Sequence, residues 1–408
     1  MTHMNYRTIV GLAVAMGLMT GVGLPVVAGG AVQKDLSSDR KIVVFNDDVS
    51  LSERDAALGD LVQNRIKRLT RALSADVLEG VDAGRLRELS QNPSVKRIDD
   101  DVTVYALERV ERLARGGTQV NAAAAQVLPW GVDRIDAELV WPTGNSADPI
   151  KVGVIDTGIS LSHPDLAANI KGTYNAIKPR RSANDDNGHG SHVAGIIAAL
   201  DNGVGVVGGA KQANLYAIKV LNSSGSGYLS DIIEGIDVAI ANNLNVINMS
   251  LGTTADVQSF HDAVIRANNA GITIVAAAGN NGGAVNYPGA YAEVIGVSAT
   301  DSTNIIASWS SRGPQVDLAA PGVSIYSNYK GTGYATLSGT SMASPHVAAA
   351  AALLMNRAIR SEEDENANGK WDPSEVRARL QATATDLGAA GADSFYGAGL
   401  VNVFAAVQ

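Results

Sequence analysis

The chain has 408 residues, 46% of them hydrophobic and 18% charged, which is enough for one large domain with smaller pieces beside it. Its net charge of −9 argues against nucleic acid as a partner, and the absence of cysteine excludes disulfides and cysteine-ligated zinc. With 43 glycines and only 4 phenylalanines, the composition favours small-residue helices packed on a sheet.

The first segment has the pattern of an export signal. Residues 8–27 are apolar, follow Arg7, and include Pro25 shortly before a small-residue cleavage pattern that ends at Ala28. This predicts a signal peptide over residues 1–28 and a secreted protein with no stable membrane association after signal cleavage. The alternative is a membrane anchor, because the apolar run is about long enough to span a bilayer.

Residues 31–105 predict a small two-layer α+β domain, ferredoxin-like in its β-α-β-β-α-β order. Strands are expected at 41–45, 73–81, 95–99 and 102–105, and helices at 52–69 and 83–90. Residues 106–125 follow as a linker that is charged at first and then rich in glycine and alanine. Such a linker is a natural site for proteolytic nicking.

From Gln126 onward, strands alternate with helices. Strands are expected at 152–156, 214–220, 246–251, 272–277 and 294–299, and helices at 188–200, 229–242 and 257–270. The alternation predicts a three-layer α/β sandwich over residues 126–408, with a mostly parallel central sheet. Catalytic groups in such a sheet gather at the carboxyl ends of its strands.

Three stretches place one reactive side chain among small residues. Asp156 ends a predicted strand, His189 begins a helix, and Ser341 follows Gly339 at the start of an apolar helix. Ser341 alone could be a helix cap. An acid, a base and a hydroxyl in the order Asp, His, Ser instead indicate a serine nucleophile with its base and orienting acid.

These stretches resemble the motifs of the subtilisin family of serine proteases, and the resemblance covers about residues 126–403. It implies a serine endopeptidase in which Ser341 attacks the substrate carbonyl and His189 transfers the proton. Asp156 would orient the imidazole, and Asn280, after an Ala-Ala-Gly run, would donate a hydrogen bond to the oxyanion.

The resemblance also implies two strands that hold an extended polypeptide substrate, and an apolar primary pocket that suits many sequences. The strand residues are Ser250, Leu251 and Gly252 on one side and Gly225, Ser226 and Gly227 on the other, and the pocket residues are Ala277, Ala278, Gly279 and Asn286. Asn286 stands where a small residue is common in the family, which leaves the depth of the pocket open.

A first calcium site is implied by the same resemblance. Its ligands would be the side chains of Gln126, Asp165 and Asn202 and the carbonyls of Leu200, Val204 and Val206. The glycine-rich turn at 201–206 can aim carbonyls inward, and calcium prefers oxygen ligands. The alternative is an ordinary surface turn.

A second calcium loop is predicted from spacing alone. Residues 364–375 fit the twelve-residue EF-hand loop, with oxygen ligands at positions 1, 3, 5, 7, 9 and 12 and Gly369 at position 6. These ligands are Asp364, Asn366, Asn368, the Lys370 carbonyl, Asp372 and Glu375. A structural Ca²⁺ ion is expected, and a solvated acidic loop is the alternative.

Residues 31–105 resemble the family's propeptide, which assists folding and then inhibits the enzyme by placing its tail in the active site. The simplest cleavage follows Tyr105, and the long linker also allows processing nearer Ala125. We therefore expect a self-processing, monomeric, secreted endopeptidase with a preference for apolar residues. A narrow-specificity processing protease, a non-catalytic relative and a permanent accessory domain are the alternatives.

Overall fold

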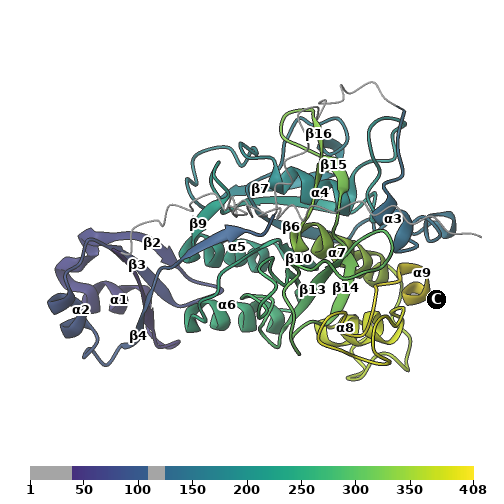
Figure 1. Ribbon diagram of the computed structural model, residues 1–408. Coiled ribbons are helices and arrows are strands. Elements are labelled where there is room, and N and C mark those ends of the chain that lie inside the picture. Colours follow the sequence, from purple (N-terminus) through teal and green to yellow (C-terminus); the bar gives the residue numbers. More distant parts are fainter. Residues whose placement is uncertain (1–38, 109–124) are drawn as a thin grey trace, which may run out of the picture. The chain divides into compact units, whose positions relative to one another are not determined.

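The computed structural model describes residues 39–108 and 125–408, so the predicted signal peptide and most of the linker lie outside the described residues. The N-terminal domain is an antiparallel sheet in the order β2-β3-β1-β4, with two helices beside it (Figure 1). Its elements are β1 (Arg40–Phe45), α1 (Leu51–Leu58), η1 (Gly59–Asn64), β2 (Arg65–Leu69), β3 (Ala75–Glu79), α2 (Ala83–Leu89) and β4 (Val95–Asp100). The β-α-β-β-α-β order is the expected one, but its strands differ from the expected set, because β2 was not expected and the strand expected at 102–105 lies outside this sheet as β5 (Thr103–Ala106).

The expected helix over 52–69 is wrong beyond Leu58. Gly59 adopts φ 56°, a left-handed conformation that ends α1, and a short 3₁₀ turn follows. Residues 65–69 then pair with β3, where Leu69 lies opposite Ala75. The apolar spacing of this stretch matches a helix, but Leu69 is fully buried as part of a strand.

The large domain is built on seven parallel strands in the order β14-β13-β12-β10-β6-β8-β7. These are β6 (Lys151–Asp156), β7 (Ile170–Asn175), β8 (Asn214–Lys219), β10 (Val246–Met249), β12 (Thr273–Ala277), β13 (Val294–Thr300) and β14 (Leu318–Pro321). Five of these strands were expected, and β7 and β14 extend the sheet at its two edges. The predicted α/β sandwich is confirmed.

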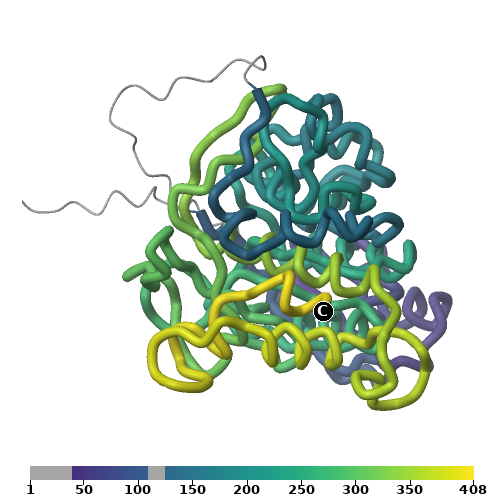
Figure 2. Tube along the Cα trace, turned by 90° about the vertical axis from the view of Figure 1, so that its right-hand side faces the viewer, coloured from purple at the N-terminus to yellow at the C-terminus, as the bar shows by residue number. Residues whose placement is uncertain are grey.

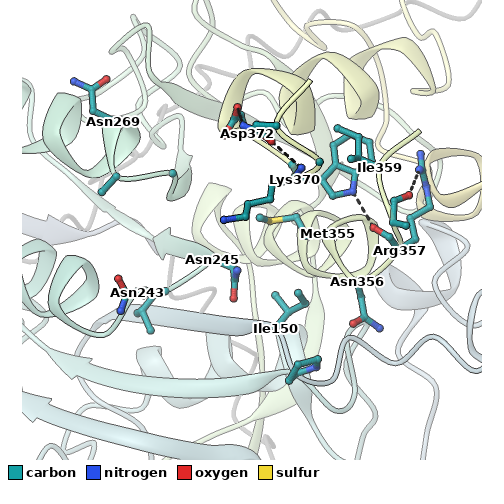
Figure 3. A pocket seen from close by; sticks show the side chains of 18 residues that line it. Ile150, Asn243, Asn245, Asn269, Met355, Asn356, Arg357, Ile359, Lys370 and Asp372 are labelled. Atoms are coloured by element: carbon teal, nitrogen blue, oxygen red, sulfur yellow. Dashed lines mark hydrogen bonds between the residues drawn. The ribbon is translucent and has the colours of Figure 1, made fainter. Parts of the chain in front are cut away.

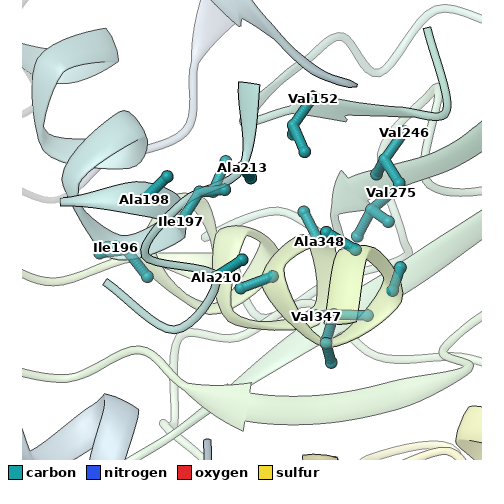
Figure 4. Packing of buried hydrophobic residues seen from close by; sticks show 14 of the residues in the cluster. Val152, Ile196, Ile197, Ala198, Ala210, Ala213, Val246, Val275, Val347 and Ala348 are labelled. Carbon is teal, nitrogen blue, oxygen red and sulfur yellow. The ribbon is translucent and has the colours of Figure 1, made fainter. Parts of the chain in front are cut away.

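Helices cover both faces of this sheet. The principal ones are α4 (His189–Ala198), α5 (Leu229–Ala241), α6 (Gln258–Asn269) and α7 (Thr340–Met355). Helices α4 and α7 belong to one apolar core, and α5 and α6 to the core on the opposite face. Figure 4 shows Ala348 of α7 on the side of the helix that faces the strand residues Val152, Val246 and Val275.

Helix α7 is buried along almost its whole length, from Thr340 to Leu354. Its alanines let it approach the sheet closely, and its N-terminus lies at the carboxyl edge of the strands, where Thr340 bonds to the residues that follow β12. The core on this face therefore fixes the position of Ser341, the second residue of the helix.

The remaining elements complete the domain. They are β5 (Thr103–Ala106), α3 (Trp130–Arg134), η2 (Trp141–Thr143), η3 (Ala167–Asn169), β9 (Ser226–Tyr228), β11 (Leu251–Gly252), β15 (Ile325–Asn328), β16 (Tyr334–Leu337), α8 (Pro373–Ala382) and α9 (Val403–Val407). Figure 2 shows the last part of the chain, in yellow, gathered around the C-terminus. Within the two described ranges, no helix is both long and apolar enough to cross a membrane.

Candidate active site

The acid and the base of the site come from two neighbouring elements. Asp156 ends strand β6, and His189 opens α4. Both side chains are fully buried, and His189 Nδ1 lies 2.8 Å from Asp156 Oδ1 and 2.9 Å from Oδ2. This contact fixes the imidazole ring and leaves Nε2 as the nitrogen that can exchange a proton with a substrate.

Charge sets the protonation of His189. Burial by itself lowers its pKa, but the charge of Asp156 and its hydrogen bond, followed by the charges of Glu108 and Asp185, raise the pKa to about 9. Its neighbour His192 behaves in the opposite way. Burial and the nearby His189 lower the pKa of His192 to about 3, so this ring stays neutral between the carbonyls of Ile325 and Ala335.

The Ser341 hydroxyl is not bonded to His189 in this structure. Its Oγ donates to the Ser250 carbonyl at 2.9 Å, while His189 Nε2 is buried without a hydrogen-bond partner among the described residues. Rotation about the Cα–Cβ bond of Ser341 is the movement that would carry Oγ from the Ser250 carbonyl to His189 Nε2. Catalytic hydrogen bonds are often not yet aligned before the reacting complex forms.

The carbonyl of Leu107 occupies the position expected of a reacting carbonyl. It accepts from Asn280 Nδ2 at 2.5 Å and from the Ser341 backbone N–H at 3.4 Å. The Asn280 amide is held in this orientation because its Oδ1 accepts from the N–H and the hydroxyl of Thr340. A Cβ on Gly339 would lie 2.7 Å from the Leu107 oxygen, so only glycine leaves room for the carbonyl there.

The segment before Leu107 lies in the cleft as an additional strand. Strand β5 pairs antiparallel with β9 on one side and with β11 on the other. Two more backbone bonds extend the ladder, from Ala106 N–H to the Gly225 carbonyl and from Leu107 N–H to the Ser250 carbonyl. The two stretches predicted to hold a substrate, 225–227 and 250–252, thus both hold the tail of the N-terminal domain.

The side chain of Leu107 lies at the residues predicted for the primary pocket. A Cβ placed on Gly252 would come within 2.9 Å of Leu107 Cδ1 and 3.3 Å of Asn286 Cβ. On the other side of Asn286, a Cβ on Gly279 would lie 3.0 Å from its Cγ. Asn286 is 8% exposed, and Ala277 and Ala278, which were also predicted for the pocket, are fully buried.

Two residues that sequence reasoning missed hold the loops around Asp156 and His189. Asp185 accepts hydrogen bonds from five donors that precede and follow it, which fixes the turn that leads into α4. Lys219, at the end of β8, donates to the carbonyls of Thr157 and Leu221 and pairs with Asp186. The Asp-Asp-Asn-Gly run before His189 was the available signal, since such residues favour side-chain-to-backbone turns.

The residues predicted for the first calcium site lie together. Gln126 Nε2 donates to the carbonyls of Leu200 and Val206, and Asn202 Nδ2 donates to Asp165 Oδ1. Asp165 is fully buried, yet no lysine or arginine in the described ranges forms a salt bridge with it. A half-turn of the two amides would present their oxygens, in place of their nitrogens, to the same centre.

The loop 364–375 is only partly arranged as predicted. Asp364 accepts from the N–H groups of Asn368 and Gly369, and Asp372 Oδ2 accepts from both Asn366 and Asn368. Glu375 instead directs its two oxygens at the N–H groups of residues 365 and 372, as part of a helix cap. Across residues 39–108 and 125–408, no three acidic or histidine side chains converge as a metal centre.

A pocket of about 820 Å³ opens at the opposite, amino-terminal edge of the strands (Figure 3). It is lined by the residues just before β6, β10 and β12, by the end of α7 and by part of the loop 364–375. None of the residues predicted to be catalytic lines it. This pocket is therefore separate from the cleft that holds β5.

The comparisons with known proteins place the chain among proteases. The model of the subtilase family matches residues 147–399. Subtilisin DY of Bacillus licheniformis is 48% identical over 290 residues, which cover 70% of this chain and 100% of that protein. Subtilisin E of Bacillus subtilis is 40% identical over 357 residues, 86% of this chain and 84% of that protein.

The minor extracellular protease Epr of Bacillus subtilis is 42% identical over 327 residues, or 78% of this chain, but the match spans only 48% of that longer protein. The region matched by the family model contains Asp156, His189, Asn280 and Ser341.

Proposed function

The chain belongs to the subtilase family and is a subtilisin-like serine endopeptidase, and from this premise we propose that Ser341, His189 and Asp156 are its catalytic triad. We propose further that the N-terminal domain, expected to begin at residue 31, is a propeptide that ends at Leu107, and that the enzyme cuts the Leu107–Glu108 bond of its own precursor. The observation that carries both statements is the Leu107 carbonyl, held by Asn280 and the Ser341 N–H at the end of a strand bound in the cleft.

The geometry supports an ordered sequence of steps. Ser341 Oγ turns from the Ser250 carbonyl to His189 Nε2, gives up its proton and attacks the Leu107 carbonyl carbon. The oxygen becomes an oxyanion, stabilised by Asn280 Nδ2 and the Ser341 N–H, and Asp156 stabilises the imidazolium. Collapse breaks the C–N bond, and His189 returns the proton to the departing amine of Glu108.

Hydrolysis completes the reaction. A water molecule gives its proton to His189 and attacks the acyl-enzyme at Leu107, which frees the Leu107 carboxylate and restores the Ser341 hydroxyl. The same cleft would then accept other extended polypeptides, since most of its contacts with β5 are backbone hydrogen bonds. This supports broad specificity with an apolar residue, such as leucine, before the cleaved bond.

The proposed processing site is thus two residues after the position that the sequence suggested. Tyr105 lies within β5, opposite Ser226 and Gly252, and it is Leu107 whose carbonyl reaches the oxyanion donors. Trimming nearer Ala125 would need a further cleavage in the linker, and most of the linker lies outside the described residues.

Mass spectrometry of the purified precursor tests this proposal. The wild type should yield a fragment that ends at Leu107 and a protease that hydrolyses casein, while Ser341→Ala should stay intact. A first fragment that ends at Tyr105 would move the cleavage site. The catalytic roles are wrong if folded wild type shows no processing, no peptide cleavage and no labelling of Ser341 by a fluorophosphonate.

Calcium is part of the proposal at the first site. There the ion would supply the positive charge that the buried Asp165 lacks and would tie Gln126 to the turn at 200–206. The second ion, in the loop 364–375, stays a prediction, because Glu375 does not meet Asp364 and Asp372.

The calcium proposal is tested by measuring Tm of the intact Ser341→Ala precursor with and without a chelator. At a calcium concentration of 100 times Kd, binding adds about 2.7 kcal/mol to the free energy of unfolding, so chelation should lower Tm by several degrees. Asp165→Asn should abolish most of this shift and one calorimetric binding event, and Glu375→Gln should abolish a second event if the loop binds calcium. An unchanged Tm on chelation would contradict the proposal.

For export, the support is the predicted signal segment together with an extracellular relative. We propose that the protein is secreted, acts on polypeptides outside the cell as a monomer, and is held inactive by its own propeptide until processing is complete.

A further inference from the structure

Helix α5 begins without a cap of its own. The residue before it, Tyr228, makes no side-chain bond to the first turn, although the first N–H groups of a helix have no partner within it. Both of the first two N–H groups instead reach the tail of the propeptide. Leu229 N–H donates to the Val102 carbonyl at 2.9 Å, and Ser230 N–H donates to Asp101 Oδ1 at 2.8 Å.

The Asp101 carboxylate is enclosed by donors on both of its oxygens. Its second oxygen, Oδ2, accepts from the Ser230 hydroxyl at 2.8 Å and pairs with Arg40 at 2.9 Å, and the residue is only 3% exposed. Ser230 is fully buried. The partners of its N–H and its hydroxyl are Asp101 and Arg40, and both lie upstream of the Leu107–Glu108 bond.

Release of the propeptide therefore empties this site while the helix stays in place. Ser230 then offers an N–H and a hydroxyl at the positive end of the α5 dipole with no protein partner. The site is continuous with the substrate cleft, because β5 pairs with β9 up to Thr103 opposite Tyr228, one residue before the helix begins.

From this arrangement we infer that the mature enzyme has a distant substrate subsite, formed by the N-terminus of α5 and Ser230, for an acidic side chain. The acidic residue is the seventh when the residue before the cleaved bond is counted as the first, as Asp101 is relative to Leu107. The inference rests on the proposed function, since it concerns the enzyme after its propeptide has left.

Helix α6 shows why the subsite is restricted to one helix. Near its N-terminus, the Ser259 N–H also donates to a propeptide carboxylate, that of Asp99, at 3.1 Å. Asp99 lies inside β4 and is held opposite Ile42 by the sheet of the propeptide. A linear substrate lacks that sheet, so it can carry an acid to α5 but has nothing that would direct one to α6.

Two changes in charge reduce the affinity expected of the subsite for an acid. Arg40, which pairs with Asp101, leaves with the propeptide, and Asp231 on the first turn of α5 loses its partner Lys67, so that its negative charge opposes an incoming carboxylate. The remaining contribution is that of a helix cap, which corresponds to about a fivefold effect on binding.

The experiment compares two acetylated peptides with the sequence of residues 101–110, one with Asp and one with Asn at position 101. For the mature wild-type enzyme, kcat/KM should be about fivefold higher for the Asp peptide, mostly through KM. Ser230→Ala should bring the ratio close to one. The matched control Ser259→Ala, which removes a buried hydroxyl at the start of α6, should leave the ratio at about five.

Equal kcat/KM values for the two peptides in the wild type would overturn the subsite while leaving the proposed function intact. An unchanged ratio in Ser230→Ala, with the fraction of folded enzyme verified by active-site titration, would also overturn it. Failure to cleave either peptide would overturn the proposed function itself, on which the subsite depends.

Discussion

The propeptide contacts the protease through two regions that differ in the kind of contact they make. In the cleft, β5 is held mainly by backbone hydrogen bonds to β9 and β11. Against α5 and α6, apolar residues of the propeptide, among them Ile42, Leu69 and Val77, share one buried cluster with the helices, and charged side chains add specific contacts. Asp237 accepts from the N–H groups of residues 70–72, Lys67 pairs with Asp231 at 2.5 Å, and Arg97 pairs with Asp262 at 2.8 Å.

The difference separates two tasks. A backbone ladder accepts almost any sequence, which suits a cleft that must later take many substrates. Paired charges require a particular partner, because truncating one member leaves the other without its counter-charge. We therefore expect changes in the cleft to alter the reaction, and changes on α5 to alter how long the propeptide stays bound.

The largest effect should follow from Asn280→Ala in the cleft. This change removes one of two donors to the oxyanion but leaves the β5 ladder in place. Turnover of peptides and processing should both fall about 100- to 1000-fold with little change in KM, a size known for the same donor in a relative. Steady-state kinetics provide the measurement, with the neighbouring Asn281→Ala as the control. A loss confined to KM would contradict the role.

A smaller effect, on the lifetime of the complex between the propeptide and the enzyme, should follow from Asp237→Ala on α5. Loss of a charged acceptor of three N–H groups costs about 1.5 kcal/mol or more, which is about tenfold in the lifetime of the processed complex. The delay between cleavage, followed by mass spectrometry, and the appearance of peptidase activity should shorten accordingly. Asp133→Ala, an exposed acid remote from this contact, should leave the delay unchanged. If kcat changed and the delay did not, the division of tasks would be wrong.

The same two regions show what a sequence can and cannot predict. Asp156, His189 and Ser341 stand in short stretches whose small residues suit strand ends and helix starts, so local pattern and their order in the chain indicated them, and the family resemblance added Asn280. The alternation of strands and helices likewise predicted the parallel sheet. These features depend on neighbours in the sequence.

Features that depend on distant partners were missed. The residue that reaches the oxyanion donors is set by how β4 docks on α6 and by the length of chain from there to Asn280, so Tyr105 could not be distinguished from Leu107. The strand at 65–69 owes its form to pairing with β3. Glu375 fits an EF-hand position by spacing, but its oxygens are engaged by backbone N–H groups in a helix cap.

The smallest effect, and the most specific, concerns Glu108, the residue just after the proposed cleavage site. Its charge, with those of Asp156 and Asp185, opposes burial and raises the pKa of His189 to about 9. Because this pKa exceeds the unfolded value of about 6.5, the contribution of His189 to stability is complete below pH 6.5 and is lost as pH rises through 9. A general base must be neutral, so processing should accelerate over the same rise.

Glu108→Gln removes one of the charges that favour the imidazolium, so the pKa of His189 in the precursor should fall. The midpoint of the pH–rate profile for processing should move to lower pH, and processing near pH 7 should become faster. The profile for peptide hydrolysis by the mature enzyme should not move, provided that residue 108 has left the cleft after cleavage. A shift in both profiles, or in neither, would show that Glu108 does not act on His189 through its charge while the Leu107–Glu108 bond is intact.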